Sequence, residues 1–361
     1  MTVLPKSTFL DYAGFGISNA ATVEAAYGIT DAQPFSDPTQ GFNMALMLRR
    51  RNDPTPLLSS SWATRQQTLK QLRDAGTLWN IYGADPKEFN RISAELKGPS
   101  YGFTLLNGSN SNYVSSPESR TLWITIDSAQ QFQALFGTPL LYSPSAGLAY
   151  WNGPLSLPDD WPIAGLWLDV ETAPLASVFT PGATATLPDG PQSPGNAASA
   201  AKSPTLFPNI IAADYYNFPL DGQQVQTGPI GLIEPNTGTA LPSDDAGTDF
   251  AKRLLDYLDK AKATPLSGNV EVLVQGVNGQ FSNGADGERS LDTGIVASIN
   301  PNSPLIFYNG SGETKATGLA QSTTFTVAQS AAWQPVDGLS PAVTTNSFGD
   351  TQEMSPGSPF Y

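Results

Sequence analysis

Two carboxylates, Glu288 and Asp292, lie four residues apart in the stretch Gly-Glu-Arg-Ser-Leu-Asp at residues 287–292. Apolar residues recur at helical spacing through and after this stretch, and the polar residues 282–286 before it can cap a helix. On such a helix both carboxylates lie on one face, about 5–6 Å apart at Cβ. Two like charges this close and partly out of water titrate as a pair, with the pKa of one raised, and can relay a proton. The alternative is that both are surface acids that complement the positive N-terminal end of the helix.

A second motif uses the same letters. Residues 292–294 read Asp-Thr-Gly, the catalytic triplet of pepsin-like proteases, which needs two such loops to bring two aspartates together. The chain contains no second Asp-Thr-Gly and no Asp-Ser-Gly, and the surrounding pattern predicts a helix instead of a strand and loop. We therefore interpret this match as accidental.

The absence of two residue types excludes much chemistry. The sequence has no Cys, which rules out disulfides, a thiol nucleophile and thiolate metal sites. It has no His, which rules out a Ser-His-Asp triad and a His-ligated zinc. Any acid–base catalysis therefore falls to carboxylates, which remain usable bases in an acidic medium. Many inert proteins also lack both residues, so the composition fits acid chemistry without requiring it.

The overall composition indicates a folded protein with many turns. The 361 residues are 40% hydrophobic and include 7 Trp, 33 Gly and 31 Pro. With 18 basic against 32 acidic residues the formal charge is −14, which disfavours nucleic acid and anionic membranes as partners. No apolar run is long enough to span a membrane, and residues 1–10 do not resemble a secretory signal, so any export would use a signal outside this sequence or another route.

The chain divides into four segments by pattern. Residues 1–40 show weak periodicity and are expected to form an irregular N-terminal arm. Residues 41–178 alternate strand and helix patterns, typical of an α+β sandwich. Strands are predicted at 42–48 and 121–126, and helices at 61–75, 86–96 and 128–137, with Ser61, Asp85 and Ser128 as candidate caps. Residues 179–204 are rich in Pro, Gly, Ala and Ser and are expected to form a linker.

The fourth segment, residues 205–361, has a different organisation. Strand patterns at 229–234, 270–274, 304–308 and 341–347 alternate with helix patterns at 249–262, around Glu288 and at 318–333. Strands that alternate with helices predict a parallel sheet of the α/β class. The pattern stops after the strand at 341–347, so we expect this sheet to be incomplete within the chain.

Short motifs in both halves resemble the sedolisin family of serine-carboxyl peptidases, in particular its kumamolisin-like members with an activation domain. In the first half they are Leu-Arg-Arg-Arg at 48–51, Tyr-Gly-Ala-Asp-Pro at 82–86, Ala-Leu-Phe-Gly at 134–137 and Leu-Ser-Leu-Pro at 155–158. In the second half they are Tyr-Asn-Phe-Pro at 216–219, Ile-Gly-Leu-Ile-Glu at 230–234, Glu-Arg-Ser-Leu-Asp at 288–292 and Asn-Ser-Phe-Gly-Asp at 346–350. The resemblance covers residues 42–361 and depends on the order and spacing of these motifs together.

The resemblance implies a fold and a set of roles. It implies a ferredoxin-like α+β pro-domain followed by the N-terminal half of a subtilisin-like α/β peptidase domain. It places the general base of an acid endopeptidase on Glu288, its partner on Asp292 and a supporting network residue on Glu234. The chain departs from the family pattern at Pro235, which follows Glu234, and at Phe348, where the family often has Trp.

The resemblance also implies what is not in this chain. The family's nucleophile in a Ser-Gly-Thr-Ser motif, its oxyanion Asp and its calcium site lie beyond the position matched by Tyr361. Ser282, Ser298 and Ser347 are available hydroxyls, but none is in that sequence context. We therefore expect no cofactor in this chain, calcium in the C-terminal half of the peptidase domain, and that half as a partner. We expect this chain alone to be inactive, the complete precursor to be secreted or extracytoplasmic, and polypeptides to be its substrate.

Two further expectations complete the sequence analysis. The alternative function is a non-catalytic structural or binding protein of the same family, which the departures at Pro235 and Phe348 would fit. If the first half is an inhibitory pro-segment, the linker near 180–204 crosses the substrate cleft. Acid would then release the segment by protonating carboxylates that pair with Arg49, Arg50 and Arg51.

Overall fold

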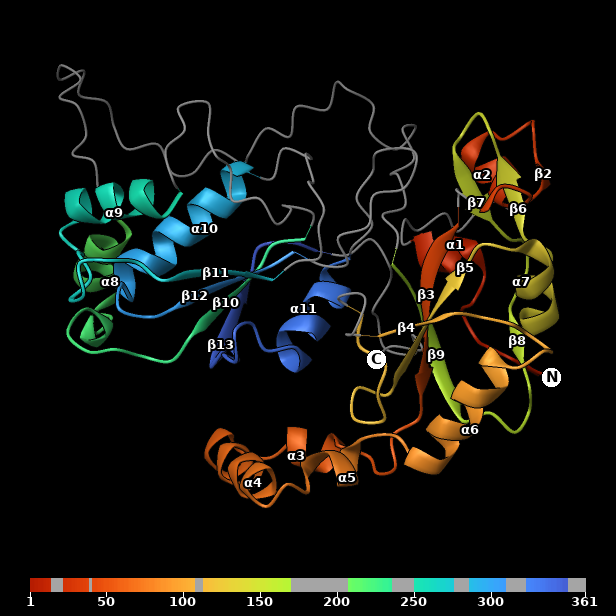
Figure 1. Ribbon diagram of the computed structural model, residues 1–361, viewed down its shortest axis with the longest axis horizontal. Helices are drawn as coiled ribbons and strands as arrows, with labels where there is room; N and C mark the ends of the chain where they lie inside the picture. Colours follow the sequence, from red (N-terminus) through yellow and green to blue (C-terminus); the bar gives the residue numbers. More distant parts are fainter. Residues whose placement is uncertain are drawn as a thin grey trace, which may run out of the picture.

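The protein is a mixed α/β structure with several sheets, one of them parallel. The computed structural model describes residues 1–13, 22–38, 41–107, 113–169, 207–235, 250–275, 286–309 and 323–349, with the side chains of residues 286–288 left out (Figure 1). Residues 1–169 are called the first half below, and residues 207–349 the second half. The expected linker at 179–204 lies outside the described residues.

The first half contains short helices and strands around one longer sheet. In chain order its elements are β1 (Thr2–Val3), α1 (Phe9–Ala13), α2 (Val23–Tyr27), β2 (Gln33–Pro34), β3 (Phe42–Leu48), α3 (Thr55–Leu58), α4 (Trp62–Asp74), α5 (Leu78–Tyr82), α6 (Pro86–Lys97), β4 (Leu105–Leu106), β5 (Thr121–Ile126), α7 (Ala129–Phe136), β6 (Leu141–Ser143), β7 (Leu148–Tyr150), β8 (Ser156–Leu157) and β9 (Ile163–Asp169). The strands expected at 42–48 and 121–126 are confirmed as β3 and β5.

The main sheet of the first half is antiparallel, in the order β4-β5-β3-β9. Every residue of β3 is buried, because both faces of the sheet are covered. One face packs on α6, α7 and the N-terminal elements in the larger hydrophobic core of the half. The other face carries Ala45, Trp123 and Trp167, which belong to a separate cluster. A strand buried on both faces needs a continuous apolar run, and the sequence of β3, Phe-Asn-Met-Ala-Leu-Met-Leu, is one apart from Asn43.

Local sequence signals place the helix ends of this half. The side-chain oxygens of Ser61, Asp85 and Ser128 accept a backbone N–H of the first turn of α4, α6 and α7 respectively, as the sequence predicts. Gly137 ends α7 with φ 71°, a left-handed conformation that glycine adopts without steric cost.

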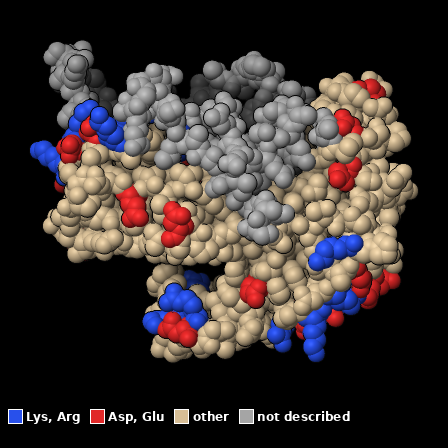
Figure 2. All heavy atoms as spheres, viewed as in Figure 1, with Lys and Arg blue, Asp and Glu red and all other residues tan. Residues whose placement is uncertain are grey.

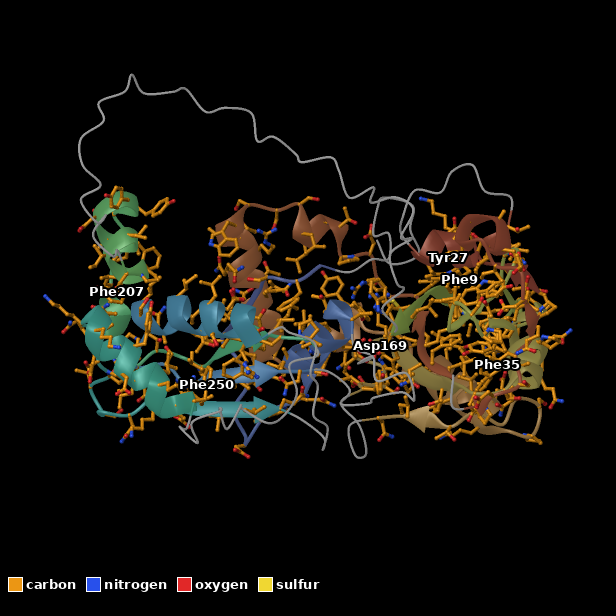
Figure 3. All side chains as sticks on the ribbon, turned by 90° about the horizontal axis from the view of Figure 1, so that it is seen from above. Phe9, Tyr27, Phe35, Asp169, Phe207 and Phe250 are labelled. Carbon is orange, nitrogen blue, oxygen red and sulfur yellow. The ribbon has the colours of Figure 1, made fainter. Side chains whose placement is uncertain are left out.

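The expectation of an irregular N-terminal arm is wrong for the residues described there. Helices α1 and α2 form within residues 1–40, and Phe9, Tyr12 and Val23 are buried in the core of the first half. Figure 3 labels Phe9 within this core. Phe9 packs edge-on against Trp151 with 5.3 Å between ring centroids. Each helix is only five residues long, too short to show a periodic pattern, so tertiary packing and not local propensity fixes this region.

The second half is built on a parallel sheet. Its elements are α8 (Pro208–Tyr216), a 3-10 helix (Asp221–Gln223), β10 (Ile230–Ile233), α9 (Phe250–Ala261), β11 (Val272–Gln275), α10 (Asp286–Ile299), β12 (Leu305–Tyr308), α11 (Thr324–Trp333) and β13 (Val343–Asn346). The strand order is β11-β12-β10-β13, and all three pairings are parallel. The parallel sheet predicted from the alternating pattern is therefore confirmed, although the helix at α8 was not anticipated as a separate element.

Helix α11 lies between the two sheets (Figure 1). Val327 and Ala331 on one side pack on Ile233, Ile306 and Tyr308 of the parallel sheet. On the other side Phe325 packs on the tryptophan-rich face of the antiparallel sheet. Helices α9 and α10 cover the opposite face of the parallel sheet. A helix that is buried on two sides has no face for charge, and α11 contains no charged residue.

Three helices of the first half, α3, α4 and α5, bring a further contact to α11. Helices α3, α4 and α5 extend from the antiparallel sheet beneath the second half (Figure 1). The ring of Trp79 in α5 lies 4.6 Å from that of Trp333 at the end of α11. Within the described part of the chain, no helix is long and apolar enough to cross a membrane.

Candidate functional site

The carboxyl edge of the parallel sheet gathers the polar residues predicted by sequence. Parallel strands end at the same edge, and Ile233 of β10 pairs with Asn346 of β13. The residues that follow them, Glu234 and Ser347, are therefore neighbours at this edge. Leu232 faces the α9 and α10 side of the sheet. Because side chains alternate along a strand, Glu234 and Ser347 point to that same side.

Asp292 reaches this edge from α10. Its side chain is buried, with 8% of its surface exposed, and the Ser347 hydroxyl donates a hydrogen bond of 2.7 Å to its Oδ2. This bond joins positions 55 residues apart, one on a helix and one just after a strand. A hydroxyl that donates to a carboxylate fixes the orientation of that group. The alternative that Asp292 is merely a solvated surface acid is wrong.

Glu288 lies one turn before Asp292 on α10, as the spacing predicts. The backbone of residues 286–292 is helical, so the two Cβ atoms are i,i+4 neighbours on one face. The Glu288 side chain lies outside the described side chains. The predicted position of this residue on the helix is therefore confirmed, and its contact with Asp292 stays a prediction.

Glu234, predicted as a supporting residue, is completely buried. Its backbone N–H donates to the carbonyl of Tyr308 in the neighbouring strand at 2.9 Å, which extends the parallel ladder to the strand end. A carboxylate is not buried at a sheet edge unless other groups satisfy it, because desolvation of the charge is costly. Glu234 is therefore not a solvated acid at the end of a strand, which is what its position in the sequence alone would suggest.

Arg289 adds a buried positive charge to this region. It is 1% exposed and its guanidinium lies 5.7 Å from the ring centroid of Phe250 in α9. Arg289 and Asp292 are three residues apart on α10. The helix therefore buries both an acid and a base in its first two turns, which is unusual unless the groups have a role.

The other named hydroxyls have structural partners or lie outside the description. Ser298 Oγ donates to the carbonyl of Ile295 in its own helix. Ser282 lies outside the described residues. Of the two hydroxyls that the structure describes, Ser347 is the one that donates to a candidate catalytic carboxylate. The sequence analysis did not predict this contact. The strand order that brings the end of β13 to α10 cannot be read from the motif at 288–292 or from the motif at 346–350.

The apolar groove beside α10 is on a different side of the helix. It has a volume of about 330 Å³ and is lined by Tyr257, Leu291, Gly294 and Ile295 among others, without Asp292. No group of three or more acidic residues in the described part of the chain is placed to hold a metal ion. The expected calcium site was assigned to a polypeptide beyond this chain, and this observation does not bear on it.

A second buried aspartate, Asp169 at the end of β9, was not predicted at all. It lies where the two halves meet (Figure 3) and has no exposed surface. Tyr113 Oη donates to its Oδ2 at 2.6 Å, and Thr326 Oγ1 donates to its Oδ1 at 2.6 Å. The backbone N–H and the hydroxyl of Thr323 also reach Oδ1, at 2.7 and 3.1 Å. Burial raises the pKa of Asp169 to about 6, although these hydrogen bonds act in the opposite direction.

The other hydrogen bonds that the described residues make between the two halves near Asp169 join uncharged side chains. Trp167 Nε1 donates to Thr323 Oγ1, and Trp123 Nε1 donates to Gln329 Oε1, each at 2.9 Å.

The three arginines at 49–51, expected to pair with carboxylates, have other contacts. Arg50 donates to the carbonyl of Tyr82 instead of a carboxylate. Among the described residues no salt bridge joins Arg49, Arg50 or Arg51 to an acid, so the ion pairs expected for these arginines are not found there. Two sequence signals could have located the contact of Asp169 with α11. They are an Asp at the end of an apolar strand and the pair Thr323 and Thr326 at the start of a helix.

No model of a known protein family matches this sequence, and no curated protein is significantly similar to it.

Proposed function

We propose that this chain is the pro-segment and the N-terminal half of the catalytic domain of a sedolisin-like serine endopeptidase that acts in acid. The observation that carries the proposal is the arrangement at the carboxyl edge of the parallel sheet. A buried Asp292, held by Ser347, lies one helical turn after Glu288 and on the same side of the sheet as the buried Glu234. This supports Glu288 as general base, Asp292 as its partner and Glu234 as a supporting residue.

The proposed chemistry needs a hydroxyl nucleophile beside Glu288. A carboxylate takes the proton of the attacking hydroxyl in the first step and returns it to the leaving amine in the second. We propose that Asp292, one turn later on the same helix, acts as the partner of Glu288. We propose that the nucleophilic Ser and an oxyanion-stabilising Asp come from the C-terminal half of the domain, and that this chain alone does not hydrolyse peptides.

The fold supports this reading in both halves. In the first half the order β4-β5-β3-β9, with α6 between β3 and β4 and α7 between β5 and β9, is compatible with a ferredoxin-like βαββαβ sandwich. In the second half, parallel strands with helices on both faces are compatible with a subtilisin-like domain. We propose a secreted or extracytoplasmic location and a calcium site in the C-terminal half from the family resemblance alone.

The sheet offers a place for the partner polypeptide. Within the described residues β13 pairs only with β10, and Val343 on it is 58% exposed. An exposed edge strand is a template on which a further strand can pair. We propose that the C-terminal half of the peptidase domain extends the parallel sheet beside β13.

The test is the composition of the native material. Intact mass and sequencing of the purified protein should find a polypeptide with a Ser-Gly-Thr-Ser motif, either continuous with this chain or bound to it. Its absence, together with a gene that ends at Tyr361, would contradict the proposal and favour a non-catalytic binding protein.

A further inference from the structure

We propose that Asp169 is a docking residue that joins the two halves of the chain and that this contact is strengthened by acid. The proposal concerns the junction between the antiparallel sheet and α11, and it does not depend on peptidase activity. It rests on the hydrogen bonds of one buried carboxylate, of which one oxygen accepts from the first half and the other from the second half.

The two oxygens of Asp169 face different parts of the chain. Oδ2 accepts from Tyr113 of the first half, and Tyr113 Oη in turn accepts from Asn43 Nδ2 at 2.7 Å. Oδ1 accepts from Thr323 and Thr326 of the second half. A chain of hydrogen bonds therefore runs from β3 to the first turn of α11 through a single carboxyl group.

The helix end is where this carboxyl group has its largest effect. The first backbone N–H groups of a helix have no partner within the helix. Thr323, the N-cap of α11, accepts from the Thr326 N–H, and its own N–H donates to Asp169. Asp169 thus extends the cap of a second-half helix from a first-half strand. Docking completes α11, and separation leaves its N-terminal end without this acceptor.

The surroundings of Asp169 determine its response to pH. On β3, Asn43 is paired with Asp169 and bonds to Tyr113. Tyr113, from the segment before β5, and Thr323 and Thr326, at the start of α11, bond to Asp169 directly. Tyr113 is the titratable side chain among them, and no Lys or Arg in the described residues is bonded to Asp169. Because no cation among the described residues is bonded to this carboxyl group, its charged form bears the full cost of burial, which the neutral form avoids.

The direction of the effect follows from linkage. Burial raises the pKa of Asp169 from its ordinary 3.8 to about 6, so the docked form binds a proton more tightly than the separated form. The contribution to docking is complete below about pH 3.8, falls as pH rises and is lost above about pH 6. Two pKa units correspond to a change of about 100-fold in the docking equilibrium, of which about tenfold falls between about pH 5 and pH 7.5. This sign is opposite to the acid release expected from carboxylates paired with arginines.

The consequence is that the first half stays on α11 in acid. If the chain is a zymogen, acidification alone does not open this junction, and loss of the first half needs cleavage of the segment between the halves. The contact would then weaken when the protein meets neutral pH.

The test is hydrogen exchange of the full chain at about pH 5 and pH 7.5, corrected for intrinsic rates and read in peptides from β9 and α11. The wild type should lose about tenfold in protection in these peptides as pH rises. Asp169→Asn keeps the shape of the group, with the side-chain amide donating to Tyr113 and the side-chain carbonyl accepting from α11. Because this side chain does not titrate, protection in the variant should change little between the two pH values. Asp31→Asn removes an acid that Ser143 and Ser145 hold outside this contact, and it should behave as the wild type.

Two results would overturn the proposal. One is the same loss of protection in Asp169→Asn as in the wild type, and the other is wild-type protection that is flat or rises with pH. Should Asp169→Asn not fold, Thr326→Val decides. That variant removes a donor that favours the ionised form, so the pH range of the loss should move upward, and an unchanged range would contradict the proposal.

Discussion

Helices α10 and α11 cover opposite faces of the same parallel sheet, yet they bury very different side chains. Helix α11 contacts a sheet on each side, carries no charged residue and meets the carboxylate of Asp169 from outside. Helix α10 contacts one sheet, borders an open groove and itself carries the buried Arg289 and Asp292. A helix enclosed on two sides serves packing and docking, whereas a helix with one free side can hold charged groups at its end. The second half thus keeps docking and candidate chemistry on separate helices.

The largest effect is expected at the contact of α11 with the first half. Trp167 is completely buried, its ring lies 4.8 Å from that of Phe325, and its N–H donates to Thr323. Trp167→Ala should lower the free energy of unfolding by about 3–5 kcal/mol, through lost apolar contacts and the cavity left behind. Urea denaturation followed by circular dichroism measures it.

The control for this change is Trp62→Ala. Trp62 is 69% exposed, so its loss should change the free energy of unfolding by about 0.5 kcal/mol or less. Equal losses for the two variants would show that the antiparallel sheet does not dock on α11 as described.

A smaller effect is expected at the α10 site. Ser347→Ala removes the hydroxyl that donates to the buried carboxylate of Asp292. A hydrogen bond to a charged group contributes about 1.5–3 kcal/mol, and the lower end applies where water can replace the donor. The same denaturation series measures it, with Ser267→Ala as the control because Ser267 is exposed and its hydroxyl bonds to the backbone of Asn269, two residues away, and not to a carboxylate. If the two serine variants are equally stable, Ser347 does not hold Asp292.

The smallest change tests the open side of α10. Gly294 lies in the middle of the helix, and a Cβ there would meet the Tyr257 ring at 3.4 Å, an ordinary contact with a side chain at the groove. Gly294→Ala should therefore raise the free energy of unfolding by about 0.5–1 kcal/mol, because alanine loses less conformational entropy in a helix. Thermal denaturation measures this change as a higher midpoint temperature. A lower midpoint for Gly294→Ala than for the wild type would mean that the groove side of α10 is as closely packed as α11.

The sequence predicts the parts of the fold that local patterns control. The strands β3 and β5, the caps at Ser61, Asp85 and Ser128, and the parallel sheet follow from apolar runs, cap residues and alternation of elements. The N-terminal helices do not follow, because five-residue helices depend on the tertiary contacts of Phe9 and Val23.

For the site, the sequence places Glu288 and Asp292 on one helix, since their spacing alone is sufficient. It does not reveal Ser347 or Asp169 as partners in long-range contacts. Ser347 meets Asp292 only because β13 pairs with β10, and Asp169 meets Thr323 only because α11 lies between two sheets. Contacts of this kind depend on strand order and domain packing, which no short motif contains.

The most direct test of the proposed chemistry is peptide hydrolysis at about pH 4 by this chain together with the C-terminal half of the peptidase domain proposed above. The account predicts acid-dependent cleavage that Glu288→Gln and Asp292→Asn each reduce by at least about 100-fold, as expected for the loss of a general base or its partner. Glu271→Gln, which neutralises an exposed acid next to β11, should leave the rate unchanged. Cleavage that survives Glu288→Gln at the wild-type rate, or none by the wild-type assembly, would contradict the account.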